Sequence, residues 1–254
     1  MATYKKRGYK PKTKKEKEDI VEENSATAEV FNTLDEGASK TEEWFVKNQN
    51  IIIGAIAVIA LVVLGYLGYN RFIAEPQQKE AMNEMYQAKK YFEDAANGIS
   101  SDSLYTMALN GGEGKYGMLD IIDQYGGTQA ANLANYYAGI AYLNLKDYQN
   151  AITYLSDFTS DDKMLGPIAK GGIGDAFVQL EQPTEALEYY EKAFKANVNS
   201  FTTPMYLLKA AKVAIDLGEN AKALDYLNRI KSEFDDSTEA SQVDVLIGKV
   251  EASL

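Results

Sequence analysis

The segment from Ile51 to Tyr69 restricts the fold of this chain more than any other feature. Its nineteen residues carry no charge, and Arg71 is the first charged residue after it. At a helical rise of about 1.5 Å per residue, the segment nearly matches the hydrocarbon thickness of a bilayer, roughly 30 Å. It is apolar on every helical face and fifty residues precede it, which fits neither a surface helix of a soluble core nor a cleavable signal. We therefore expect one transmembrane helix over residues 51–69.

The charges before this segment predict its orientation. The preceding tail is short and carries eight basic side chains between Lys5 and Lys17. Short segments follow the positive-inside rule, whereas long domains cross membranes largely regardless of charge. We therefore expect residues 1–50 in the cytoplasm and residues 73–254 on the other side of the membrane.

The tail of residues 1–50 is predicted to be charged and largely disordered. Residues 1–24 are rich in Lys and Glu and nearly free of aliphatic side chains, a composition that cannot form a core. A weak amphipathic helix over residues 26–48 would be interrupted at Gly37. Two interpretations of the basic residues 5–17 remain open: contact with anionic lipid or the ribosome, or a solvated tail that helps to set the topology.

Composition excludes several classes of function. The net charge is −11, and residues 1–50 hold ten basic and ten acidic side chains, so the rest of the chain carries the whole excess. An acidic outer domain argues against nucleic-acid binding there. The absence of cysteine and histidine from the sequence excludes disulfides, thiolate or imidazole metal ligands and His-dependent triads. We predict no catalytic residue, no metal site and no cofactor. The remaining enzyme hypothesis would rely only on carboxylates, Ser, Lys or Tyr, and no residue spacing supports it, so we predict a protein that is not an enzyme.

Three stretches beyond the span repeat one pattern of small residues. A first small residue is followed twelve positions later by an alanine, and the pairs are Gly139 with Ala151, Gly174 with Ala186, and Ala211 with Ala223. Successive alanines of these pairs are 35 and 37 residues apart. A period near 34 is typical of tetratricopeptide repeats, in which antiparallel helices approach closely where both carry small residues.

The remaining segments complete one domain over residues 73–254. Irregular helices are expected over residues 77–125, repeats over about 131–235, and a capping helix over 237–253. Thr203 before Pro204 predicts a helix start, whereas Gly171-Gly172 inside a helix is the weakest point of the pattern. The predicted fold class is all-α, with a single N-terminal transmembrane helix followed by a tetratricopeptide-repeat α-solenoid.

The order of these parts resembles the YfgM-type family of bacterial single-span proteins. The resemblance rests on "WFVKNQNIIIGAI" before and into the span, on "LDIIDQYGGTQAANLANYYAGIAYLNLKDYQNAITYL", and on the later repeats, and it covers most of residues 44–235. It implies a bacterial inner-membrane protein whose repeat domain faces the periplasm. It also implies two partners, the SecYEG translocon and a PpiD-like membrane chaperone, and therefore an ancillary role in assisting secreted proteins.

The first helix of each tetratricopeptide repeat lines the concave face, which makes it the predicted binding groove. The positions concerned are Leu133, Tyr136, Ile140, Leu143 and Asn144, then Ile168, Gly171, Asp175, Val178 and Gln179, and finally Met205, Leu208, Lys212, Ile215 and Asp216. Such a surface, apolar with few polar groups, suits an apolar helix or an unfolded segment. Lys212 alone is basic, which disfavours a C-terminal carboxylate as the ligand. The alternative is that several of these side chains only pack against neighbouring helices.

Together these features predict a non-catalytic, membrane-anchored protein–protein interaction module in the secretion or periplasmic chaperone machinery. The alternative is a structural scaffold in envelope assembly or cell division, which would use the same solenoid for other partners. No small-molecule substrate is expected, and the lipid bilayer is the remaining predicted partner.

Overall fold

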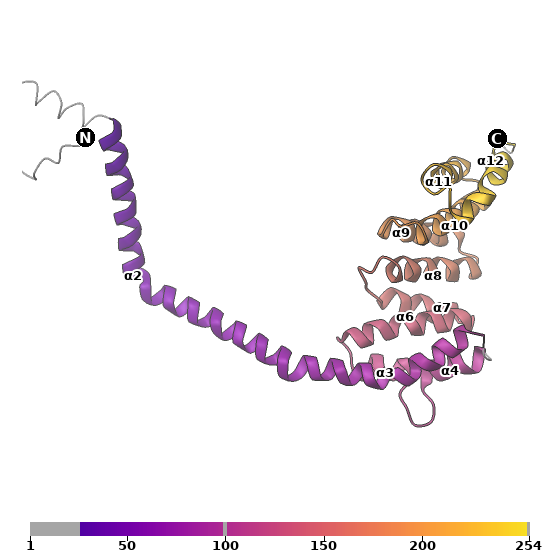
Figure 1. Cartoon of the computed structure of the whole chain (residues 1–254), viewed down its shortest axis with the longest axis horizontal. Coiled ribbons are helices and arrows are strands. Elements are labelled where there is room, and N and C mark those ends of the chain that lie inside the picture. The colour runs from indigo at the N-terminus through magenta and orange to yellow at the C-terminus, as the bar shows by residue number, and fades with distance from the viewer. Residues whose placement is uncertain (1–25, 99–100, 253–254) are drawn as a thin grey trace, which may run out of the picture. The chain divides into compact units, whose positions relative to one another are not determined.

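The computed structural model describes residues 26–98 and 101–252, and the chain divides into two compact units, residues 1–69 and 70–254. Unit 1 contributes one long helix, α2 (Ala26–Tyr69), which follows the grey N-terminal trace in Figure 1. An apolar window of mean hydropathy 2.7 lies in the helical stretch that starts at Trp44, and none of this window is buried in the protein. By length and composition, this is a candidate membrane span. Residues 1–25, which were predicted to be disordered, lie outside the described residues.

The helix expected over residues 26–48 is present, but the predicted interruption at Gly37 is wrong. Helix α2 begins at Ala26 and continues through Gly37 into the apolar segment. A glycine inside a helix costs only about 1 kcal/mol relative to alanine. Extending an existing helix needs no new nucleus, so the long apolar helix can continue through a residue that would stop a short one.

Unit 2 is a stack of helices, and three successive hairpins form its main part (Figure 1). A π-helical turn (Asn70–Ala74) leads into α3 (Glu75–Ala96), α4 (Ser101–Asn110) and α5 (Met118–Gln124). The first repeat consists of α6 (Gln129–Asn144) and α7 (Tyr148–Asp157), the second of α8 (Leu165–Gln179) and α9 (Pro183–Ala196), and the third of α10 (Thr202–Asp216) and α11 (Asn220–Glu233). A 3-10 turn (Thr238–Gln242) and α12 (Val243–Glu251) follow.

Two helix starts show how local polar residues fix the repeats. Thr128 caps α6, because its Oγ1 accepts a hydrogen bond of 3.1 Å from the backbone N–H of Ala131. The predicted cap at Thr203, with Pro204 as the first helical residue, is wrong by two residues, since α10 begins at Thr202 and Thr203 is fully buried. Asn199 supplies the cap instead, with its Oδ1 accepting from the backbone N–H of Thr202 at 2.7 Å. Such side-chain acceptors satisfy N–H groups that have no partner inside the helix.

Glycines bring the helices together at two positions where a side chain would collide. A methyl carbon in place of the Gly139 hydrogen would lie 2.5 Å from Cγ of Leu155 on the facing helix α7. At Gly171 such a carbon would lie 1.9 Å from Cε1 of Tyr206, which reaches α8 from the next repeat. The glycine that weakened the sequence pattern is therefore required by the close approach of a buried ring.

Helix α12 covers the end of the stack. Val243 and Val250 are each 1% exposed and join the hydrophobic core of the third repeat, which includes Ile230. Asp244 and Lys249 lie on its exposed side. Val245 is also exposed, at 75%, so the outer side combines charged residues with one apolar side chain. A helix that packs one side on the last repeat in this way can end a solenoid.

Candidate protein-binding site

The residues predicted to line the groove differ widely in what they contact. The first-repeat residues Tyr136 and Ile140 are partly buried and pack against a cluster that contains Leu155 and Ile173. The ring of Tyr136 lies 5.2 Å from that of Phe158, centroid to centroid. Burial, followed by the neighbouring Tyr137, raises the pKa of the Tyr136 hydroxyl above its usual value. Both side chains therefore connect the first and second repeats.

The predicted groove residues of the second and third repeats are also unequal. Leu208 does not fit the prediction of an accessible residue, because it is only 6% exposed and belongs to the core of the third repeat. Lys212 is exposed and its Nζ lies 3.3 Å from Oε1 of Gln242. Gln179 is exposed and accepts a hydrogen bond of 3.3 Å from the hydroxyl of Tyr148.

The other predicted residues fall between these extremes. Leu143, Met205, Ile168 and Ile215 are partly buried, Gly171 is buried, and Asn144, Val178 and Asp216 are exposed. No continuous apolar strip of freely exposed side chains follows from this set, because its larger apolar members are partly or wholly used in packing.

Asp175 has a specific structural partner set that the sequence pattern did not indicate. Its Oδ1 accepts a hydrogen bond of 2.6 Å from the hydroxyl of Tyr190, and Lys209 Nζ lies 2.7 Å from the same oxygen. Burial, and then the charge of Asp175, raises the pKa of the Tyr190 hydroxyl well above its usual value. These groups link α8, α9 and α10, so the carboxylate is engaged within the protein.

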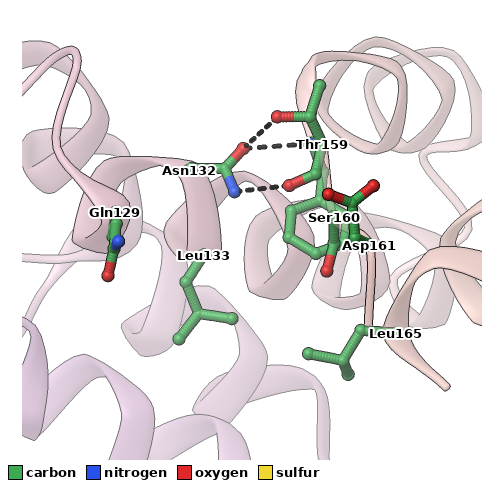
Figure 2. Close-up of a pocket in the computed structure, with 8 residues that line it drawn as sticks. Gln129, Asn132, Leu133, Thr159, Ser160, Asp161 and Leu165 are labelled. Atoms are coloured by element: carbon green, nitrogen blue, oxygen red, sulfur yellow. Dashed lines mark hydrogen bonds between the residues drawn. The ribbon is translucent and has the colours of Figure 1, made fainter. Parts of the chain in front are cut away.

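An open cavity of about 430 Å³ lies where the first and second repeats meet (Figure 2). Its lining combines the start of α6, the turn after α7 and the start of α8, and consists of Gln129, Asn132, Leu133, Phe158, Thr159, Ser160, Asp161 and Leu165. We call these eight residues the edge pocket. Leu133 is the one residue of the predicted groove that lines it. Ligand sites of this size are usually apolar clefts with a few placed polar groups.

Asn132 holds the wall of the edge pocket in place. Its Nδ2 donates to the carbonyl of Thr159 at 2.7 Å, while its Oδ1 accepts from the Thr159 backbone N–H at 3.0 Å (Figure 2). The side-chain amide thus pairs with the backbone of the turn that precedes α8. Because both ends of the amide are engaged, the turn is fixed relative to α6 and the pocket is formed without a ligand.

Carboxylates at the rim differ in their availability. Asp162 Oδ1 accepts from the backbone N–H groups of Leu165 and Met164, each at 2.8 Å, and these hydrogen bonds lower the pKa of its carboxyl group. Asp161 is exposed and lines the pocket, and its carboxylate has no hydrogen-bond or ion-pair partner within residues 26–98 and 101–252. Asp161 is therefore the charged group that is free to meet a ligand there.

Sequence reasoning missed most of the edge pocket, including Phe158, Thr159, Ser160, Asp161 and Leu165. These residues lie in or beside a turn, whereas the groove was predicted from helical positions. The signal that was available is Phe158, an aromatic residue in the otherwise polar stretch "SDFTSDDK". Within the residues that the structure describes, no group of three acidic, Cys or His side chains is placed to hold a metal ion.

The geometry defines a class of protein, a solenoid of helical hairpins, and comparison with known families specifies it. Residues 133–162 and residues 172–238 match two family models, each described as tetratricopeptide repeat. The predicted repeats are thereby confirmed for these segments. No match was found among curated proteins or among solved structures. The chain thus combines a long apolar N-terminal helix with tetratricopeptide repeats, which form a protein–protein interaction module.

Proposed function

We propose that this protein is a membrane-anchored adaptor of the protein-export machinery, an ancillary partner of the SecYEG translocon and of a PpiD-like membrane chaperone. One observation carries the proposal: a helix long and apolar enough to cross a membrane precedes tetratricopeptide repeats that leave a preformed pocket open. The resemblance to YfgM-type proteins over residues 44–235 supports the choice of partners. The repeats bind other proteins, and the anchor keeps them near the site where secreted chains emerge.

The proposal includes a topology. The N-terminal tail lies in the cytoplasm and residues 73–254 lie in the periplasm of a bacterial cell, because the short tail carries the basic cluster. Protease added to spheroplasts should therefore digest the repeats and leave a fragment of about seventy residues, the span plus the tail. If the repeats are protected until the inner membrane is opened, the orientation is reversed.

Affinity purification tests the partners. The tagged full chain is extracted in mild detergent beside two matched chains, one with residues 51–69 replaced by an unrelated apolar span and one with residues 70–254 removed. We expect translocon and chaperone subunits to be recovered with the full chain and with the replaced span, and to be lost without the repeats. Recovery of cell-division or envelope-assembly proteins in their place would overturn the proposal and support the scaffold alternative.

A further inference from the structure

We propose that the edge pocket, together with the neighbouring turn before α10, binds a polypeptide segment that combines apolar side chains with a lysine or arginine. This deepens the proposed function, on which it rests for the statement that the repeats bind proteins. It assigns the site to one edge of the solenoid, at the turns between successive repeats.

The pocket has a floor suited to one apolar side chain. Leu133 from α6 and Leu165 from α8 approach it from the two repeats, and both are labelled in Figure 2. Phe158, which is 9% exposed, completes the apolar lining. Oδ1 of Asn132 already accepts from Thr159, whereas Nδ2 keeps one N–H after its bond to the Thr159 carbonyl. An apolar side chain of the occupant is held by contact with Leu133, Leu165 and Phe158, and the polar part of the lining is left for its backbone.

A second apolar spot lies on the same edge, one repeat further along. Asn199, in the turn before α10, donates from Nδ2 to the carbonyl of Lys163 at 3.0 Å, which places this turn beside the turn that follows α7. Phe201 and Val198 in that turn are each 62% exposed. Exposed apolar residues that continue from a preformed pocket are typical of an interaction surface.

The charge of this edge selects the occupant. Asp161 lines the edge pocket, and Asp162 follows it in the turn whose Lys163 carbonyl contacts Asn199. Backbone N–H groups that donate to Asp162 lower the pKa of its carboxyl group and so favour the ionised form. Lys163 is the basic residue of this turn, and the turn before α10, residues 197–201, carries no charge. A segment with a lysine or arginine beside its apolar residue complements this surface, whereas an acidic segment is repelled.

The spacing of the two spots indicates how such a segment binds. Adjacent packed helices lie about 8–10 Å apart. A segment in the polyproline II conformation advances about 3.1 Å per residue and returns to the same face every three residues, so it would place apolar residues three positions apart on the two spots. A test ligand follows directly: a fluorescein-labelled peptide with two leucines three positions apart, each followed by lysine. Two matched peptides carry glutamate in place of lysine, or serine in place of leucine.

Fluorescence anisotropy with the full chain in detergent micelles tests the proposal. The lysine peptide should bind, and both matched peptides should bind at least about tenfold more weakly. Asp161→Lys should weaken the lysine peptide about tenfold, and Phe201→Ser about fivefold. Asp225→Lys makes the same charge change at an exposed position of α11 and should leave binding unchanged. Because Asp161, Phe201 and Asp225 are exposed, unchanged circular dichroism should accompany all three changes.

Two results would overturn the inference: equal binding of the three peptides, or equal effects of Asp161→Lys and Asp225→Lys. The outcome is separable from that of the proposed function. If the peptides fail to bind while translocon subunits are still recovered, only the edge site is wrong. If the lysine peptide binds as expected but no translocon or chaperone subunit is recovered, the edge site stands and the assignment to protein export fails.

Discussion

The two interfaces between repeats differ in the helix that supplies the aromatic ring. Between the first and second repeats the ring is Tyr136 on the earlier helix, and between the second and third it is Tyr206 on the later helix. By the repeat spacing, the position of Tyr136 on α6 corresponds to Gly171 on α8, and Ala169 on α8 corresponds to Tyr206 on α10. At the first interface the ring belongs to the earlier helix and stays partly exposed. At the second it belongs to the later helix, and Tyr206 is only 3% exposed.

The second interface also contains polar links. Lys209 on α10 pairs with Asp175 on α8 at 2.7 Å, and its Nζ lies 5.6 Å from the ring centroid of Tyr206. The first interface has the Asn132 amide at its edge and an open cavity beside it. A cavity of about 510 Å³ also lies between the second and third repeats, where α9 faces α11. Repeats with one backbone plan thus differ in which helix carries the ring, in how deeply that ring is buried, and in the polar links beside it.

The largest effect is expected when the rings of Tyr206 and Tyr136 are removed in turn. Tyr206→Ala should lower the free energy of unfolding by about 4 kcal/mol, because a fully buried ring is replaced by a cavity. Tyr136→Ala, at the first interface, should cost about 2 kcal/mol, since its ring is already partly solvated. Thermal unfolding of the full chain in detergent, followed by circular dichroism, measures both. Equal losses would contradict the difference between the interfaces.

A second test fills the space that the ring needs. Gly171→Ala should cost about 3 kcal/mol, because the new carbon would collide with Tyr206 and overpacking is costly. Combined with Tyr206→Ala, the loss should be smaller than the sum of the two single losses by more than about 1 kcal/mol. Gly248→Ala is the control, since no atom lies within 4 Å of the added carbon. Additive losses would mean that Gly171 and Tyr206 are not matched to one another.

A contact of the fold or of the candidate site could be predicted from the sequence when both residues belong to one repeat, and could not when the partner lies in another repeat or in a turn. Small residues at a fixed period predicted the hairpins, and Gly139 meets Leu155 within its own repeat. Gly171 looked like a defect, because its partner Tyr206 lies in the next repeat and no local rule connects them. The edge pocket was missed for the same reason, since the side-chain pairing of Asn132 with Thr159 joins an early helix to a later turn.

A third test, with a smaller expected effect, measures how much the polar links contribute to stability. Tyr190→Phe removes the hydroxyl that donates to Asp175 and should cost about 1 kcal/mol; hydrogen bonds to charged groups contribute about 1.5–3 kcal/mol, and partial exposure of this carboxylate reduces the value. Tyr148→Phe removes an exposed hydrogen bond of 3.3 Å to Gln179 and should change the unfolding free energy by less than about 0.5 kcal/mol. Equal effects of the two changes would mean that the hydrogen bond from Tyr190 to Asp175 contributes no more to stability than an exposed one.

The smallest expected effect is a dependence of stability on pH at the interface between the first and second repeats. The pKa of Asp162 is lowered by backbone N–H groups in the folded protein, so its contribution is complete above the unfolded value of about 3.9 and is lost as pH falls through the lower folded value. Asp162→Asn should therefore flatten the decline of the melting temperature between about pH 5 and the acid limit of the fold. Parallel declines for the two proteins would show that these hydrogen bonds do not favour the ionised carboxylate.

The cap formed by α12 has a consequence for crowding at a membrane. An uncovered solenoid end fits the opposite end of another copy, and such head-to-tail contacts do not close but grow into filaments. Val243 and Val250 turn inward over the third repeat, while Asp244 and Lys249 meet solvent. Stacking of a second copy on this end is therefore disfavoured by the charged residues, and Val245 is the exposed apolar residue that opposes them. If the proposed anchor holds the copies in a membrane, this end resists their growth into filaments.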